Sequence, residues 1–186
     1  MSKPKNREEI HYENLFDRNV NFNERIIYLT YDVDEYSLEL VQKAMDEFDQ
    51  KPDKPIRIEI SSYGGSVYDM LGIVDRIKAS PCHIVTRGLG KVMSAATFIL
   101  AAGDKRILSK HSWLMIHQLS TWIAGKSSDL ANEMKHIKQL EDQACELYED
   151  LSGGKTKAST FKKLQKRDNY MNAEEVLELG LIDEIV

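Results

Sequence analysis

The sequence has only two cysteines, no long hydrophobic run and no excess of basic residues. Cys82 and Cys145 are isolated and form no CxxC pair, so neither a disulfide framework nor a zinc site is expected. No stretch approaches the roughly 20 apolar residues of a membrane-spanning helix. Residues 1–16 also lack the apolar core of a signal peptide. These absences predict a protein of the reducing cytoplasm, without a membrane anchor.

The charge balance is slightly acidic. The chain has 25 Lys and Arg residues against 30 Asp and Glu residues, which gives a formal net charge of -5. Such a chain has no general electrostatic attraction for nucleic acid or for an anionic membrane. Its 186 residues, 42% of them hydrophobic, suit one soluble globular domain. We expect that domain over residues 21–186, after a polar segment at 1–20.

Strand and helix patterns alternate along most of the chain. Ile56, Ile58 and Ile60 recur at every second residue, which predicts a strand at 54–61. A Gly-Gly turn ends this strand, and a helical pattern follows at 66–79. Further strands are predicted at 24–30, 83–90, 105–108, 113–117 and 181–186, and further helices from near Ser37 after a cap at Asp34, from Ser94, and at 127–151, 158–166 and 172–180. This alternation favours an α/β fold with a parallel sheet and helices packed on it.

One predicted helix, at 127–151, is about six to seven turns long. Its apolar residues recur at three and four positions, at Leu130, Met134, Ile137, Leu140, Ala144, Leu147 and Leu151. Two interpretations are open. The helix lies on its own sheet, or it projects and buries this narrow stripe against another subunit. We favour the second, because the helix is long for a compact domain of this size.

The glycine-rich run "TRGLGKVMSAATFILAAG" does not fit the common nucleotide-binding or hydrolase motifs. A phosphate loop fails because Val85 replaces its first glycine and Val92 follows the lysine. A dinucleotide fingerprint fails because Met93 takes the third glycine position. The GxSxG elbow fails because Val92 and Ala96 flank Ser94. We therefore expect no nucleotide cofactor and no bound metal.

Ser94 nevertheless has the setting that a nucleophile needs. It follows a glycine-rich strand and begins a helix, where unpaired backbone N–H groups can stabilise an oxyanion. A base is required as well, and His117 ends a strand where a loop begins. Taken alone, Ser94 is more often a satisfied core hydroxyl and His117 more often a core histidine. A carboxylate should orient the imidazole, but spacing selects none of the 30 acids.

Four motifs in order resemble the ClpP family, the proteolytic subunits of ATP-dependent Clp protease. They are "ERIIYL", "KPIRIEISSYGGSVYDMLGIVDRI", "VMSAATFILAAGDKRILSKHSWLMIHQ" and "KRDNYMNAEEVLELGLIDEIV". The resemblance is collinear from residue 24 to residue 186. It implies that Ser94 is the nucleophile, His117 the general base and Asp168 the orienting carboxylate. The oxyanion donors would be the N–H groups of Gly65 and Ala95.

The resemblance also implies a fold and an assembly. The fold would be a spiral of repeated strand–strand–helix units, shared with the crotonases, with a protruding handle at about 118–153. Segments 63–65 and 119–123 would flank a polypeptide substrate. Two heptamer rings would stack through the handles, as a homo-oligomer fed by an AAA+ unfoldase. The function implied is that of a serine endopeptidase in a compartmentalised protease.

The sequence departs from the family pattern in places. Tyr63 stands where proline is usual, and Ala95 and Ala96 replace the usual Met-Gly after the nucleophile. The family's apolar N-terminal segment is not recognisable in residues 1–20. Two alternatives remain beside the active peptidase. One is a non-catalytic ring subunit, and the other is a crotonase-type acyl-CoA enzyme, which would need an acid/base carboxylate instead of a Ser–His pair.

Overall fold

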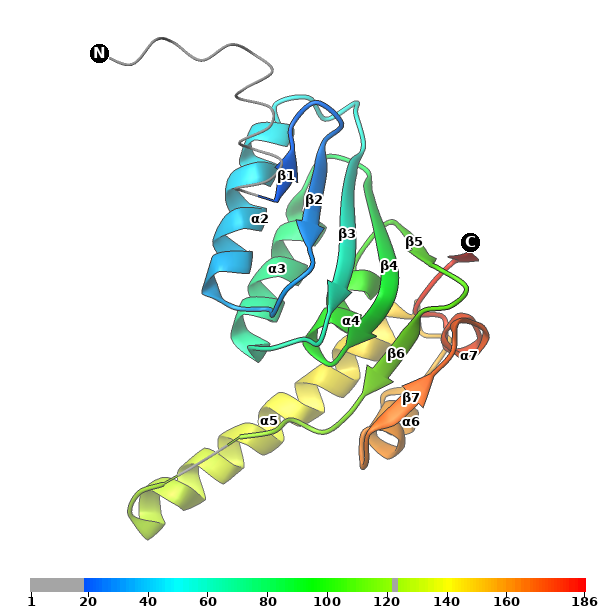
Figure 1. Ribbon diagram of the computed structural model, residues 1–186. Helices are drawn as coiled ribbons and strands as arrows, with labels where there is room; N and C mark the ends of the chain where they lie inside the picture. Colours follow the sequence, from blue (N-terminus) through cyan, green and yellow to red (C-terminus); the bar gives the residue numbers. More distant parts are fainter. Residues whose placement is uncertain (1–18, 122–123) are drawn as a thin grey trace, which may run out of the picture.

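The described residues, 19–121 and 124–186 of the computed structural model, form one mixed sheet with helices packed on it (Figure 1). The strands are β1 (Val20–Asn21), β2 (Ile26–Leu29), β3 (Ile56–Ser62), β4 (Ile84–Met93), β5 (Lys105–Leu108), β6 (Trp113–Ile116), β7 (Asn169–Met171) and β8 (Glu184–Ile185). Their order is β1-β2-β3-β4-β5-β8, and β6 pairs with β4 and with β7. Pairing is parallel except between β1 and β2 and between β6 and β7. The α/β prediction is confirmed.

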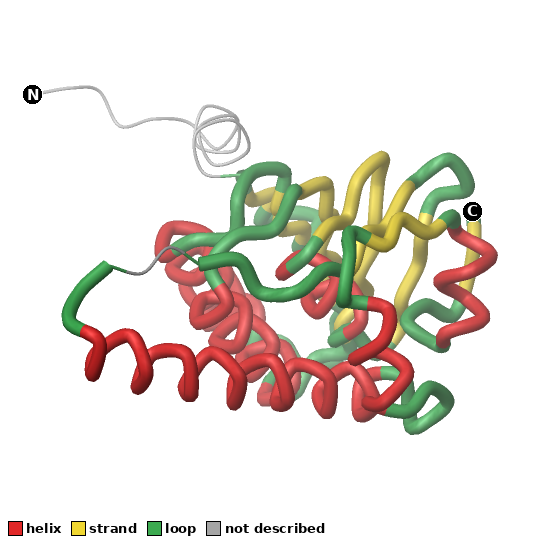
Figure 2. Tube along the Cα trace, turned by 90° about the horizontal axis from the view of Figure 1, so that it is seen from below, coloured by secondary structure: helices red, strands yellow, loops and turns green. Residues whose placement is uncertain are grey.

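Six helices are described. They are α2 (Glu35–Phe48), α3 (Val67–Ala79), α4 (Ala95–Ala101), α5 (Ser127–Leu151), α6 (Ala158–Leu164) and α7 (Ala173–Leu179). Figure 2 shows α2, α3, α4 and α5 on one side of the strands, so that face of the sheet is covered by helices. Within the described residues, no helix is both long and apolar enough to cross a membrane.

The core lies between the sheet and these helices. Ile56, Ile58 and Ile60 of β3 are fully buried, which confirms the predicted alternation. They belong to one cluster with Met45 of α2 and Ile73 of α3, which are fully buried as well. Each such side chain contributes about 1.5–3 kcal/mol through its removal from water. This burial fixes the strands that end at the candidate site.

Local signals set the helix ends. Asp34 accepts a hydrogen bond from the Ser37 amide and Ser37 caps in return, so α2 begins at Glu35, two residues earlier than predicted. Asn172 and Glu175 form the same kind of box at α7. Gly180 ends α7 with a φ of 82°, a conformation that glycine adopts without strain.

Strand β4 extends to Met93, beyond the predicted 83–90. The extension has a physical cause, because β4 changes its partner. Its residues from Val85 to Gly88 pair with β5, and its residues from Lys91 to Met93 pair with β6. Gly90, with a φ of 68°, lies between the two pairings. The change of partner brings β6, and the loop that follows it, beside the end of β4.

Helix α5 has the predicted bounds but two different halves. Its buried residues are all in the C-terminal half, at Ala144, Cys145, Tyr148 and Leu151. The N-terminal half extends beyond the sheet in Figure 1, and Met134 there is 57% exposed. The idea that the whole stripe needs another subunit is therefore wrong for Ala144 and Leu151, which belong to the chain's own core, and for Leu147, which packs against it. Leu130, Ile137 and Leu140 are only partly buried.

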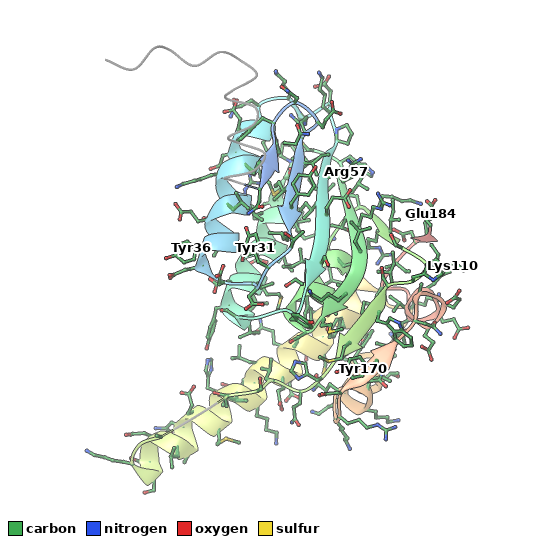
Figure 3. The ribbon with its side chains drawn as sticks, viewed as in Figure 1. Tyr31, Tyr36, Arg57, Lys110, Tyr170 and Glu184 are labelled. Carbon is green, nitrogen blue, oxygen red and sulfur yellow. The ribbon has the colours of Figure 1, made fainter. Side chains whose placement is uncertain are left out.

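The sheet face away from these helices carries charged residues. Arg57 Nε lies 2.9 Å from Glu59 Oε1, and Arg87 Nη1 lies 3.8 Å from the same oxygen. Lys105 and Glu184 pair at 2.7 Å. Figure 3 labels Arg57 and Glu184 among the side chains of this part of the sheet. Both guanidinium groups thus face one oxygen of the buried Glu59 carboxylate, and Glu59 Oε2 has no hydrogen-bond partner among the described residues.

Candidate active site

Ser94 sits in the turn between β4 and α4. Its φ of 52° and ψ of -125° are unusual for a residue other than glycine, and such a conformation costs about 1–3 kcal/mol. Neighbouring hydrogen bonds hold it there. The Ser94 N–H donates to Met115 O of β6 at 2.8 Å, and Ser94 O accepts from the Thr97 N–H at 2.9 Å. The turn therefore presents one fixed hydroxyl at the end of the sheet.

His117 follows β6 directly, and strand register places it beside Ser94. Met93 of β4 is opposite Met115 of β6, so the residues that come next on each strand emerge at the same edge. His117 Nε2 lies 2.8 Å from Ser94 Oγ. The imidazole is mostly enclosed, with its side chain 23% exposed. When Nδ1 carries the ring proton, Nε2 is free to accept the Ser94 hydroxyl proton.

Asp168 precedes β7, which runs antiparallel to β6 with Asn169 opposite Ile116. This register brings Asp168 next to His117. The distance from His117 Nδ1 to Asp168 Oδ1 is 3.9 Å, and the Asp168 side chain is 64% exposed. That distance is within the range of an ion pair but too long for a hydrogen bond. The predicted hydrogen bond between these two groups is therefore not made in this conformation. Among the described residues, no ion pair links Asp168 to Lys166 or Arg167.

The Gly64–Gly65 turn approaches the Ser94 turn closely. A Cβ atom on Gly64 would lie 2.6 Å from Met93 O and 2.8 Å from Ser94 Cβ. A Cβ atom on Gly65 would lie 2.1 Å from Val33 O. Both φ angles, 96° and 152°, lie in the region that favours glycine. Glycine is therefore required at both positions, at Gly64 by the close approach of the Ser94 turn and at Gly65 by the close approach of Val33.

Two backbone amides at the site have no acceptor within the described residues. In the bridge between Val33 and Gly65, the bonds run from Val33 N to Gly64 O and from Ser66 N to Val33 O, so the Gly65 N–H takes no part. The Ala95 N–H, in the first turn of α4, has no partner either. Unpaired N–H groups next to a nucleophile are the donors that an oxyanion needs.

A small cavity of about 30 Å³ adjoins these groups. Ser94, Ala95, Gly65 and His117 form its polar end. The rest of its lining is mostly apolar and consists of Val67, Met70, Phe98, Leu119, Ala144, Tyr148 and Gln165. Of these residues, only Leu119 lies in a segment predicted to flank the substrate. The others come from α3, α4, α5 and the residue after α6, and only the core-facing spacing within the helices indicated them.

Two predicted segments lie wholly or partly outside the described residues. They are residues 1–18 of the N-terminal segment, and Trp122 and Ile123 of the predicted substrate-flanking segment. Within the described residues, no group of three or more His, Cys, Asp or Glu side chains could hold a metal ion.

Comparisons with known proteins match this chain to peptidase subunits. Residues 7–186 match the Clp protease family. The ATP-dependent Clp protease proteolytic subunit 2 of Corynebacterium efficiens is 33% identical over 178 residues, which cover 92% of this chain and 86% of the relative. The ATP-dependent Clp protease proteolytic subunit of Porphyromonas gingivalis is 35% identical over 167 residues, covering 88% and 74%. The chain therefore belongs to the Clp protease family.

Proposed function

We propose that this chain is a serine endopeptidase in which Ser94, His117 and Asp168 form the catalytic triad. One observation carries the proposal: Ser94 Oγ lies 2.8 Å from His117 Nε2, in a member of the Clp protease family. A hydroxyl and an imidazole at this distance can exchange the proton that nucleophilic attack must release. The strained backbone at Ser94 and the free amides of Gly65 and Ala95 are further support.

In the first half of the reaction, Ser94 Oγ attacks the carbonyl carbon of the scissile peptide bond. His117 Nε2 takes the Ser94 proton as the new C–O bond forms, and the carbonyl oxygen becomes an oxyanion. The Gly65 and Ala95 N–H groups would donate to that oxygen. His117 then gives the proton to the leaving amine, the C–N bond breaks, and the acyl group remains on Ser94.

Water completes the cycle. His117 takes one proton from a water molecule, whose oxygen attacks the acyl carbon, and the same two amides stabilise the second oxyanion. The C–O bond to Ser94 breaks, and the proton on His117 returns to Ser94 Oγ. Asp168 favours the tautomer with the proton on Nδ1 and stabilises the imidazolium that forms twice in each cycle. A movement of Asp168 by less than 1 Å toward His117 would make its hydrogen bond.

The substrate is proposed to be an extended polypeptide. Tyr63, Gly64 and Gly65 form one edge beside Ser94, and the segment after His117 forms the other. The mostly apolar cavity between them would take a small apolar side chain next to the scissile bond. In this arrangement the substrate carbonyl meets Ser94 while its side chain is removed from water.

The assembly is a proposal as well. The partly buried Leu130, Ile137 and Leu140, in the first half and near the middle of α5, would pack against a second subunit, as the handle of stacked rings. The relatives are named as ATP-dependent, so an AAA+ unfoldase is the proposed partner. The proposed location of both is the cytoplasm.

The two alternative functions fit less well. A non-catalytic subunit would not need the Ser94–His117 contact, and a crotonase-type enzyme would not need this serine.

A fluorophosphonate probe tests the proposal directly. The probe phosphonylates an activated serine and releases fluoride, and peptide mapping then locates the label. We expect label on Ser94 and its loss in His117→Ala, because the hydroxyl is activated only through the imidazole. Label on any other serine, or equal labelling without His117, would contradict the assignment of the nucleophile.

Asp168→Asn should lower kcat for short peptides by about 100-fold. Loss of the triad carboxylate costs up to about 10⁴-fold in rate where that group is buried and hydrogen-bonded. Here it is 64% exposed at 3.9 Å, so we expect a smaller loss. The measurement is steady-state hydrolysis of a fluorogenic peptide. Asp150→Asn, an exposed carboxylate on α5, is the matched control and should retain full activity. A wild-type rate in Asp168→Asn would place the orienting carboxylate elsewhere.

A further inference from the structure

The carbonyl oxygen of Ser94 accepts two hydrogen bonds from one residue. The Thr97 N–H donates at 2.9 Å, and the Thr97 hydroxyl donates at 2.6 Å. Thr97 is fully buried within α4, where a polar side chain is costly unless it is satisfied. The serine catalytic cycle described above uses neither Thr97 nor its hydroxyl.

A second buried hydroxyl, that of Tyr148, completes a chain of hydrogen bonds. It contacts Thr97 Oγ1 directly. A hydroxyl has one proton, and Thr97 gives its proton to Ser94 O, so the Tyr148 O–H must donate to Thr97 Oγ1. Burial raises the pKa of Tyr148, so the phenol stays protonated and remains a donor. The order is thus Tyr148 O–H to Thr97 O–H to Ser94 C=O.

The Tyr148 ring is held firmly in place. It stacks on Phe98 of α4 with ring centroids 3.8 Å apart, and on Phe161 of α6 with centroids 4.8 Å apart. The residue is 2% exposed and lies in the packed half of α5. Figure 1 shows α4 between the sheet and this part of α5. The hydroxyl is therefore a fixed anchor, which reaches the Ser94 turn across the contact between α4 and α5.

The anchored carbonyl and one proposed oxyanion donor are two ends of the same peptide unit. Ser94 C=O and Ala95 N–H belong to one planar group, and no cis peptide is present among the described residues. In a planar trans unit the C=O and the N–H point in opposite directions. Fixing the oxygen toward Thr97 therefore fixes the N–H away from α4. Hydrogen bonds to the C=O also polarise the unit and strengthen donation by its N–H.

We propose that Thr97 and Tyr148 are positioning residues, which form a buried hydroxyl relay that aims and polarises the Ala95 N–H for the oxyanion. The inference rests on the proposed function, because it needs an oxyanion at that place. It goes further in assigning a role to two hydroxyl groups from different helices, which act on the Ala95 N–H and not on the reacting atoms; the Tyr148 ring also lines the cavity beside Ser94. The relay acts through the backbone, so it should affect the transition state and leave substrate binding almost unchanged.

Three variants separate the hydroxyl groups from packing. Thr97→Val replaces the hydroxyl with a methyl group, Tyr148→Phe keeps both ring stacks, and Thr97→Ser keeps the hydroxyl. Loss of a whole oxyanion donor costs about 10²–10³-fold in kcat, so we expect about 10-fold for Thr97→Val and about threefold for Tyr148→Phe. KM should change less than twofold, and Thr97→Ser should retain the wild-type kcat. Tyr36→Phe, which removes an exposed hydroxyl, is the matched control.

The inhibition constant of a peptide aldehyde separates an effect on the oxyanion position from an effect on stability alone. It forms a hemiacetal with the serine, and the resulting oxygen occupies the oxyanion position. Its inhibition constant should rise in Thr97→Val and Tyr148→Phe by the same factors as kcat falls. The double variant should lose no more than Thr97→Val alone, because the two hydroxyls act in series.

Thermal unfolding measured beside the kinetics makes the outcome decisive. Lower melting temperatures with unchanged kcat and aldehyde inhibition would overturn the relay and leave a purely structural hydrogen bond. If Thr97→Val does not fold, the result for Tyr148→Phe decides in the same way. A wild type with neither hydrolysis nor Ser94 labelling would instead overturn the proposed function, and the role of the relay with it. An active wild type with unaltered variants would overturn the relay alone.

Discussion

Replacing Ser94 with alanine is expected to lower kcat/KM for short fluorogenic peptides by at least about 10⁴-fold, because the covalent route is lost. His117→Ala should lower it to a similar extent, and the double variant should lose little more, since the two residues act as one unit. The fold should persist. The change removes one hydroxyl, whose partner is the partly exposed imidazole, and the backbone bonds that hold the turn remain.

Hydrolysis and unfolding must be measured on the same preparations. Ser159→Ala, an exposed serine on α6, is the control and should match the wild type in both. Retention of wild-type hydrolysis by Ser94→Ala would remove the peptidase assignment for this site. A large fall in melting temperature would instead show that Ser94 is mainly structural. That result would favour the simpler view of Ser94 as a satisfied core hydroxyl.

The parts of the fold that follow local rules could be predicted from the sequence. The alternation of Ile56, Ile58 and Ile60 needs only the geometry of a strand with one buried face. The cap at Asp34 and the stop at Gly180 depend on residues within one turn of a helix. Such signals depend on neighbouring residues alone. The helices therefore form where the sequence predicted them, with ends shifted by at most about two residues.

Features that depend on distant partners could not be predicted in this way. The extension of β4 to Met93 requires β6, about 20 residues later in the chain. Strand β7 was not predicted, because three residues against one side of β6 leave no periodic pattern. The stripe on α5 shows the same limit. Periodicity identified an apolar face, but it could not show that Leu151 meets its own core while Met134 meets solvent.

The residues of the candidate site also differ in how far the sequence alone could predict them. Residue chemistry indicated Ser94 at the start of a helix and His117 at the end of a strand, whereas Asp168 came only from the family resemblance. Its place beside His117 results from the register of β6 and β7. Thr97 and Tyr148 gave no signal, because they are 51 positions apart and each resembles an ordinary core residue of its own helix. Only packing of α4 against α5 brings their hydroxyls together.

Replacing both Ile137 and Leu140 with aspartate is expected to break the proposed assembly into smaller species. These residues lie near the middle of α5, before its first buried residue at Ala144, and are only partly buried. Full burial of such a side chain contributes about 1.5–3 kcal/mol, and a charge there must be desolvated instead. Sedimentation velocity should show a large particle for the wild type and a much smaller one for the variant.

The control carries the same added charge on exposed positions of the same helix, as Asn132→Asp with Gln139→Asp. It should sediment like the wild type, which separates loss of the apolar contact from simple charge repulsion. Activity should fall in the first variant, because residues 118–121, which follow His117, line the same groove as Met134 and Ile137, and a charge there would disturb them. A wild type that sediments as a single 21.3 kDa monomer at micromolar concentration would show that this half of α5 needs no partner. The proposed stacked rings would then have no physical basis, although the Ser94–His117 pair would remain.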